Sequence, residues 1–210
     1  SGHAVYSQLV MNNRGSLFFE LGPNYLTESA AMFNENLLRE HLLTVSKDPK
    51  ILAGIRWDIL NEMMYLWELA RRAKFEMVCY DRVAADEITD EKGFNKACLE
   101  VGNQYDIFFP KHRELELHWI RKHHYWTNQT YYLNYVIAHI LALKYLELFR
   151  ADPAGFPPKY VAMLSAGFDR PATKLLKDFL NIDFEDPDLL KGIFEMIQKK
   201  FDEVKNLEKR

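Results

Sequence analysis

The sequence predicts an all-α protein, folded as a single compact multi-helix domain over residues 1–210. Apolar residues recur at helical spacing along almost the whole chain, and clusters of proline, glycine and aspartate separate the helical segments. The composition is that of a globular protein, with 48% apolar and 27% charged residues. A chain of this length can bury a substantial core, and no internal repeat or long linker divides it.

The first half of the chain opens with a helical pattern, "HAVYSQLVM", followed by "LFFELGPN" as a short loop or strand-like link. Pro49 suits the first turn of a long helix. Thr89 or Asp90 can cap the next helix, and Pro110 breaks it. Long helices are therefore expected over about residues 25–46, 49–85, 90–109 and 127–149.

The second half contains "ELELHWIRKHHYW", a helix or helix-loop piece, and "ADPAGFPP", the clearest loop of the chain. Three short helices are expected after this loop, the first of them starting near Pro158. The second has Asp169 as its cap and Pro171 in its first turn. The third has Asp186 as its cap and Pro187 in its first turn. The charged tail "KKFDEVKNLEKR" is interpreted as a solvated helix end.

Charge and hydropathy exclude several classes of partner. The formal net charge of −3 gives no basic field for nucleic acid. The most apolar run, "YVIAHILALKYL", is too short to span a bilayer and contains His139 and Lys144. Cys79 and Cys98 lie in helical patterns without metal or redox spacing, which is typical of buried thiols in a reducing compartment. With no signal-peptide pattern at the start, we expect a cytoplasmic protein with no nucleic-acid or membrane partner.

Two carboxylates lie in register on the helix that begins "YLTESAAMFNENLL". Glu28 and Glu35 are seven residues apart, close to two helical turns, and therefore share a face. His3 lies 25 residues before Glu28, in the preceding helical pattern. Zinc peptidases use two histidines on one helical turn, a third ligand from another element, and a carboxylate base. From the residues alone, His3 is most simply a solvated histidine and Glu28 a half-exposed carboxylate, so a metal role for them depends on the family resemblance that follows.

The stretch "GHAVYSQ", followed by "YLTESAAMFNENLL", resembles the region just after the zinc motif of the oligoendopeptidase F group. These are zinc endopeptidases related to thimet oligopeptidase. The resemblance implies that His3 is the second zinc histidine, that Glu28 is the third ligand, and that Glu35 orients a ligand or a neighbouring helix. It also implies Zn²⁺ as the cofactor and short peptides as substrates. The fold would be the C-terminal portion of a gluzincin-type catalytic domain.

The segment "HWIRKHHYWTNQTYYLNYVIAHI" resembles the family's aromatic segment, in which a histidine and tyrosines stabilise the oxyanion of the substrate. The resemblance implies catalytic roles for His124, Tyr132 and Tyr135, and substrate binding by His123 and Tyr131. The spacing from His124 to Tyr135 is one residue longer than the usual pattern. The three tyrosines therefore remain alternatives for the oxyanion donor.

Two other features are interpreted as structural. His139 lies one turn after Tyr135 and is expected to pack between helices. The stretch "LSAGFDRPATKLLKDFLNID" resembles the family's C-terminal helices, which close the far wall of the cleft.

The family's zinc motif, His-Glu-x-Gly-His-Ala, would place its first histidine and the catalytic Glu four and three positions before His3. The chain is therefore expected to be a C-terminal piece of a larger enzyme, truncated inside the zinc motif. Alone, it should bind zinc weakly or not at all and should not hydrolyse peptides. The expected partner is the N-terminal part of the same enzyme, without which an exposed apolar face would favour self-association.

Three other functions are considered. A dipeptidyl carboxypeptidase of the angiotensin-converting kind has a similar zinc motif, although "ESAAMFNE" favours the oligoendopeptidase group. A non-catalytic helical interaction module, or a degenerate peptidase relative, would explain the missing motif. A ferritin-like di-metal protein is excluded because no histidine has a Glu three residues before it.

Overall fold

Helices are the only regular elements in the computed structural model, which describes residues 2–207. The all-α prediction is therefore confirmed. The helices gather into two compact units, the first comprising Ser1–Met64 and Ile137–Arg210 and the second Tyr65–Val136. That residues 1–210 form a single domain stays a prediction. No helix between residues 2 and 207 has both the length and the apolar character needed to cross a bilayer. The cytoplasmic location also stays a prediction.

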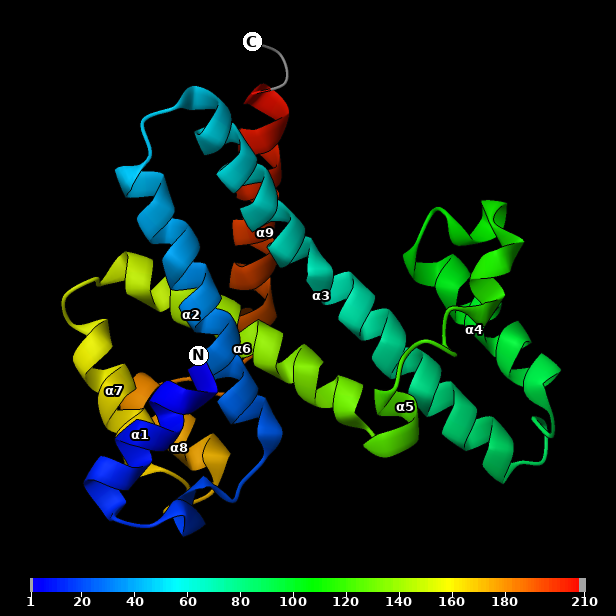
Figure 1. Ribbon diagram of the computed structural model, residues 1–210, viewed down its shortest axis with the longest axis horizontal. Coiled ribbons are helices and arrows are strands. Elements are labelled where there is room, and N and C mark those ends of the chain that lie inside the picture. The colour runs from blue at the N-terminus through cyan, green and yellow to red at the C-terminus, as the bar shows by residue number, and fades with distance from the viewer. Residues whose placement is uncertain (1, 208–210) are drawn as a thin grey trace. The chain divides into compact units, whose positions relative to one another are not determined.

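The first unit has its core between α2 (Asn24–Val45), α6 (Tyr131–Ala151) and α7 (Phe156–Ala166). Phe33 of α2 contacts the rings of Tyr145 in α6 and Tyr160 in α7 edge-on, with centroid distances of 5.7 and 5.1 Å. Helix α1 (Gly2–Arg14) packs against α2 and α7, and α7 packs against α8 (Ala172–Leu180) (Figure 1). The elements of this unit are α1 (Gly2–Arg14), η1 (Leu17–Glu20), α2 (Asn24–Val45), the start of α3 (Pro49–Ala84), most of α6 (Tyr131–Ala151), α7 (Phe156–Ala166), α8 (Ala172–Leu180) and α9 (Asp188–Leu207).

Several boundaries in the first unit agree with the sequence prediction. Helix α3 begins at Pro49, as expected. The Asp186 carboxylate accepts a hydrogen bond from the Asp188 amide at 2.9 Å, at the start of α9. Helix α7 begins at Phe156, two residues before the expected Pro158.

Three expectations for the first unit are wrong. The link after Ser16 is a 3₁₀ turn rather than a loop or strand-like segment, because the Ser16 side chain caps it by accepting from the Phe18 amide. Asp169 does not cap α8. It pairs with Arg14 and Arg170 instead. The last helix, α9, is long rather than short, because the charged tail continues it and buries Val204 against the unit.

The second unit has a core of Phe75, Cys98, Val101, Phe109 and Trp119, which pack together. Cys79 also lies in this core, and both cysteines are free thiols. The elements are the rest of α3, α4 (Glu91–Tyr105), η2 (Phe109–Lys111), η3 (Arg113–Leu117), α5 (His124–Thr127) and the first turns of α6.

Helix α4 begins as predicted but ends early. The Asp90 carboxylate caps it by accepting from the Gly93 amide at 3.0 Å. It ends at Tyr105, four residues before the predicted end, because Phe109 folds back onto Gly102. A Cβ atom on Gly102 would lie 1.9 Å from the Phe109 ring, so only glycine permits this contact.

Candidate functional site

His3 of α1 and Glu28 of α2 face each other in the first unit. The His3 Nε2 atom lies 3.4 Å from Glu28 Oε2, and the side chains are 55% and 14% exposed. Two ligand atoms, each 2.0–2.2 Å from a tetrahedral zinc ion, are about 3.4 Å apart. The spacing of the pair therefore fits a shared zinc ion.

A close approach between α1 and α2 positions this pair. Gly2 is buried, and a Cβ atom at this position would lie 2.3 Å from the Cα atom of Ala31. The absence of a side chain lets the two backbones come near each other. Because His3 follows Gly2 and Glu28 lies about one turn before Ala31, the same approach places the two candidate ligands together.

The pair supplies only two protein donors. Among residues 2–207, no group of three or more His, Cys, Asp or Glu side chains could hold a metal ion. A catalytic zinc site has three protein ligands and one open position. The Glu35 carboxylate, 63% exposed, lies 3.7 Å from Arg39 Nη1 on the same helix. The proposed metal roles of His3, Glu28 and Glu35 stay predictions.

His139 is a packed histidine, as the sequence analysis expected. Its side chain is fully buried, and Nδ1 lies 3.8 Å from Glu62 Oε1. Burial lowers the pKa of His139 to about 4, so the imidazole is neutral at physiological pH.

His124 and three tyrosines form one aromatic cluster in the second unit. The His124 ring stacks on Tyr131, with a centroid distance of 4.9 Å and an interplanar angle of 16°. It meets Tyr132 and Tyr135 at 5.8 and 5.6 Å, with both rings steeply inclined. The His123 ring lies 3.9 Å from that of His124. The structure thus brings together all five residues that the sequence placed in the catalytic and substrate-binding roles.

The members of this cluster differ in exposure. Tyr132 is buried and packs against Leu69 and Ala73, and burial raises the pKa of its phenol. Tyr131 and Tyr135 are half-buried. A phenol that keeps its proton at neutral pH is an uncharged hydrogen-bond donor, which suits stabilisation of an oxyanion. The individual roles of the three tyrosines stay predictions.

Glu76 of α3 fixes the start of α6, where these tyrosines lie. Its Oε1 atom accepts a hydrogen bond from the Thr130 amide at 2.6 Å, and it also accepts from the Tyr132 amide. Thr130 has a positive φ of 56°, which ends the preceding turn and explains why α6 begins at Tyr131 rather than at Thr127. Burial raises the pKa of Glu76, and these hydrogen bonds partly offset the effect.

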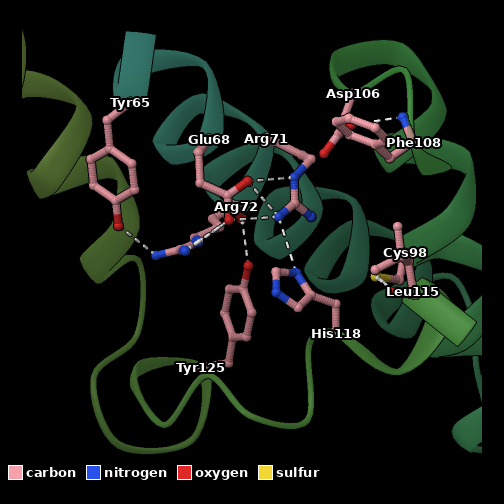
Figure 2. Close-up of polar contacts among 10 residues, drawn as sticks. All are labelled: Tyr65, Glu68, Arg71, Arg72, Cys98, Asp106, Phe108, Leu115, His118 and Tyr125. Carbon is pink, nitrogen blue, oxygen red and sulfur yellow. Dashed lines mark hydrogen bonds and ion pairs between the residues drawn. The ribbon is translucent and has the colours of Figure 1, made fainter. Parts of the chain in front are cut away.

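The sequence analysis missed a charged network on α3 (Figure 2). Arg71 donates to Glu68 from Nε at 2.9 Å and from Nη2 at 2.7 Å, and Arg72 Nε donates to Glu68 at 2.8 Å. Arg72 also donates to the Tyr65 hydroxyl, and the Tyr125 hydroxyl donates to the Arg72 carbonyl at 3.1 Å. The available signal was the spacing of three and four residues between the glutamate and the two arginines.

Known proteins are similar to this chain over nearly its whole length. The chain is 25% identical to an oligoendopeptidase F homolog of Lactococcus lactis subsp. lactis over 226 residues, covering 98% of this chain and 34% of that protein. It is 24% identical to the group B oligopeptidase PepB of Streptococcus agalactiae, covering 99% of this chain and 34% of that protein. Over this length the chain is similar to the C-terminal part of oligoendopeptidase F. No protein-family model matches it.

The fold is also found in a solved structure. The crystal structure of oligoendopeptidase-F from Enterococcus faecium superposes with a TM-score of 0.78 at 19% identity, covering all of this chain and 38% of that one. The chain spans about a third of the length of the curated relatives it matches. The resemblance stated from the sequence, to the C-terminal part of this family, is confirmed.

Proposed function

We propose that the chain is part of a zinc-dependent peptidase that hydrolyses internal bonds of short peptides. The observation that carries this proposal is the 3.4 Å spacing of His3 Nε2 and Glu28 Oε2, which come from different helices. The names of the relatives, oligoendopeptidase and oligopeptidase, support peptide hydrolysis as the reaction.

His3 and Glu28 would hold the zinc ion together with a ligand from outside the described residues. A bound zinc ion supplies a Lewis acid and lowers the pKa of a water molecule. His124 and a tyrosine of the cluster, Tyr132 or Tyr135, would donate hydrogen bonds to the carbonyl oxygen as its negative charge develops. His123 and Tyr131 would contact the peptide. In the family the general base lies in the zinc motif, so this chain alone is not expected to turn over peptides.

Exposed apolar residues on α2 support an additional partner. Leu38, Leu42 and Val45 lie at helical spacing and are 57%, 38% and 53% exposed. We propose that the remainder of a longer enzyme covers this stripe, and that two copies associate through it when that remainder is absent.

Two alternatives remain. The Lactococcus lactis relative reported above is named as an oligoendopeptidase F homolog, which supports this reaction over that of a dipeptidyl carboxypeptidase. A non-catalytic interaction module is favoured by the lack of a three-donor group among residues 2–207 and by the exposed stripe on α2. Zinc binding at the pair distinguishes the module from the peptidase.

The test is a zinc titration of the chain with isotopically labelled histidine, followed by NMR of the imidazole signals. Because the pair lacks its third ligand, binding is expected to be weak, and the titration is therefore carried to high zinc concentration. The His3 signals should shift or broaden at a lower zinc concentration than those of His41, and this difference should be lost in Glu28→Ala. His41, an exposed histidine on the same helix as Glu28, serves as the internal control.

The proposal is contradicted if His3 responds to zinc no more strongly than His41 does. It is equally contradicted if the His3 response is unchanged in Glu28→Ala. Either result would favour the non-catalytic module.

A further inference from the structure

A small cavity in the second unit has a strongly basic lining. Its volume is about 10 Å³, close to the space of one water molecule. Arg71, Arg72, His118 and Lys122 line it together with apolar and aromatic side chains. These residues come from α3 and from the segment after η3 that leads to His124.

The charges around this cavity do not balance. Arg71, Arg72 and Lys122 are three cations, and the single carboxylate of Glu68 pairs with both arginines. In the part of the chain that the structure describes, no carboxylate lies within ion-pair distance of Lys122 Nζ. Arg71 and Arg72 have side chains only 5% and 13% exposed, so water screens them little. Two buried guanidinium groups that share one carboxylate leave an excess of positive charge, which is costly where water is excluded.

His118 adds a hydrogen-bond donor without adding charge. Its Nδ1 atom lies 3.2 Å from Arg71 Nη2 (Figure 2). Because a guanidinium can only donate, Nδ1 must accept, and the proton of the neutral ring is on Nε2. Burial, followed by the charges of Arg71 and Lys122, lowers the pKa of His118 and keeps it neutral.

Positive charge also dominates the environment of Lys122. Burial and then the positive charge of Arg72 lower the pKa of its ammonium group. Glu68 opposes this effect but does not overcome it. An anion beside Lys122 would remove the repulsion among these cations.

We propose that this cavity binds one small inorganic anion, such as chloride, through Lys122 and the guanidinium groups of Arg71 and Arg72. A monatomic anion is the smallest candidate for this volume, whereas a carboxylate-bearing ligand would not fit. The bound anion ties α3 to the segment that carries His123 and His124 within the second unit. This site does not depend on the proposed peptidase reaction.

Thermal unfolding of the chain in sodium chloride and in sodium gluconate of equal ionic strength tests the site. Chloride should raise Tm by roughly 2–4 °C once its concentration exceeds Kd about fivefold. Lys122→Met should lose the difference between the two salts. Lys96→Met should keep it, because Lys96 is 76% exposed and lies in α4 of the same unit.

Equal Tm values in the two salts would overturn the proposal and mean that the cavity holds only water. A chloride effect that persists in Lys122→Met would overturn it as well. If Lys122→Met does not fold, crystals of the unaltered chain grown in sodium bromide replace it. An anomalous peak in the cavity supports the site, and an empty cavity refutes it.

Discussion

The two units hold their candidate residues by different means. In the first unit, His3 meets Glu28 because α1 and α2 approach closely where Gly2 has no side chain. In the second unit, the residues around His124 are held by polar groups of α3, among them the Glu76 carboxylate that anchors the start of α6. The arrangement in the first unit therefore depends on the close fit of two helices, and the arrangement in the second unit depends on buried charged groups.

This difference teaches which changes each unit should tolerate. A contact set by shape should resist changes of charge but fail when volume is added. A contact set by buried charge should fail when one partner is removed, since the other is left unpaired. The substitutions of Glu68 and Gly2 below test this distinction, and a pH experiment on His139 tests whether a buried titratable group in the first unit affects stability.

The largest expected effect is that of Glu68→Ala in the second unit. The substitution leaves Arg71, with a side chain only 5% exposed, without its carboxylate. We expect a loss of about 2–4 kcal/mol in the free energy of unfolding, measured by urea denaturation with tryptophan fluorescence. Glu100→Ala is the control, since Glu100 pairs with Arg82 at a more exposed site and should cost about 0–1 kcal/mol. Equal losses in the two variants would show that burial of the pair does not matter.

The second-largest expected effect is a loss of stability at acid pH caused by the buried His139 of the first unit. The pKa of His139 is about 4 in the folded chain, below the ordinary value of 6.5. Between these values the unfolded chain binds a proton that the folded chain does not, so stability falls as the pH drops from 6.5 towards 4. The expected loss is about 2 kcal/mol at pH 5 relative to neutral pH.

The measurement is Tm as a function of pH for the unaltered chain and for His139→Gln. Burial raises the pKa of Glu62, which acts in the opposite direction, but Glu62 is present in both proteins. Between pH 6.5 and 4, the Tm of His139→Gln should therefore fall less steeply than the Tm of the unaltered chain. Parallel curves would mean that His139 is not the group responsible.

The smallest expected effect is that of Gly2→Ala. The added methyl group would overlap the Ala31 backbone, so α1 must move away from α2. We expect the free energy of unfolding, measured by thermal denaturation, to fall by about 1 kcal/mol. We also expect a weaker response of the His3 imidazole signals to zinc. Gly54→Ala is the matched control, since nothing lies within 4 Å of the added atom, and it should stabilise the chain by about 0.5–1 kcal/mol. An intact zinc response in Gly2→Ala would show that the close approach does not position the pair.

The features that the sequence predicted well are local ones. Pro49 begins α3, and Asp90 caps α4, because both signals act on neighbouring backbone groups. The meeting of His3 with Glu28, and of His124 with the tyrosines, followed only from a resemblance to a family. Spacing along the chain does not determine which helices are neighbours.

Most of the failures involve partners that are distant in the sequence, and the 3₁₀ turn capped locally by Ser16 is the exception. Asp169 looks like a helix cap, yet it pairs with Arg14, which is 155 residues away in the sequence. The end of α4 depends on Phe109 packing against Gly102, and the start of α6 depends on Glu76, 54 residues before Thr130. No window of a few residues contains this information.

The two buried cysteines have a practical consequence. Burial raises the pKa of Cys79 to about 12 and also raises that of Cys98. Since the thiolate is the reactive form, the folded chain should be inert to maleimide dyes at neutral pH. A cysteine introduced at an exposed lysine of each unit, by Lys47→Cys and Lys96→Cys, would then accept a fluorophore on an otherwise unlabelled molecule. Single-molecule energy transfer between the two dyes would then measure the distance between the labelled positions in solution.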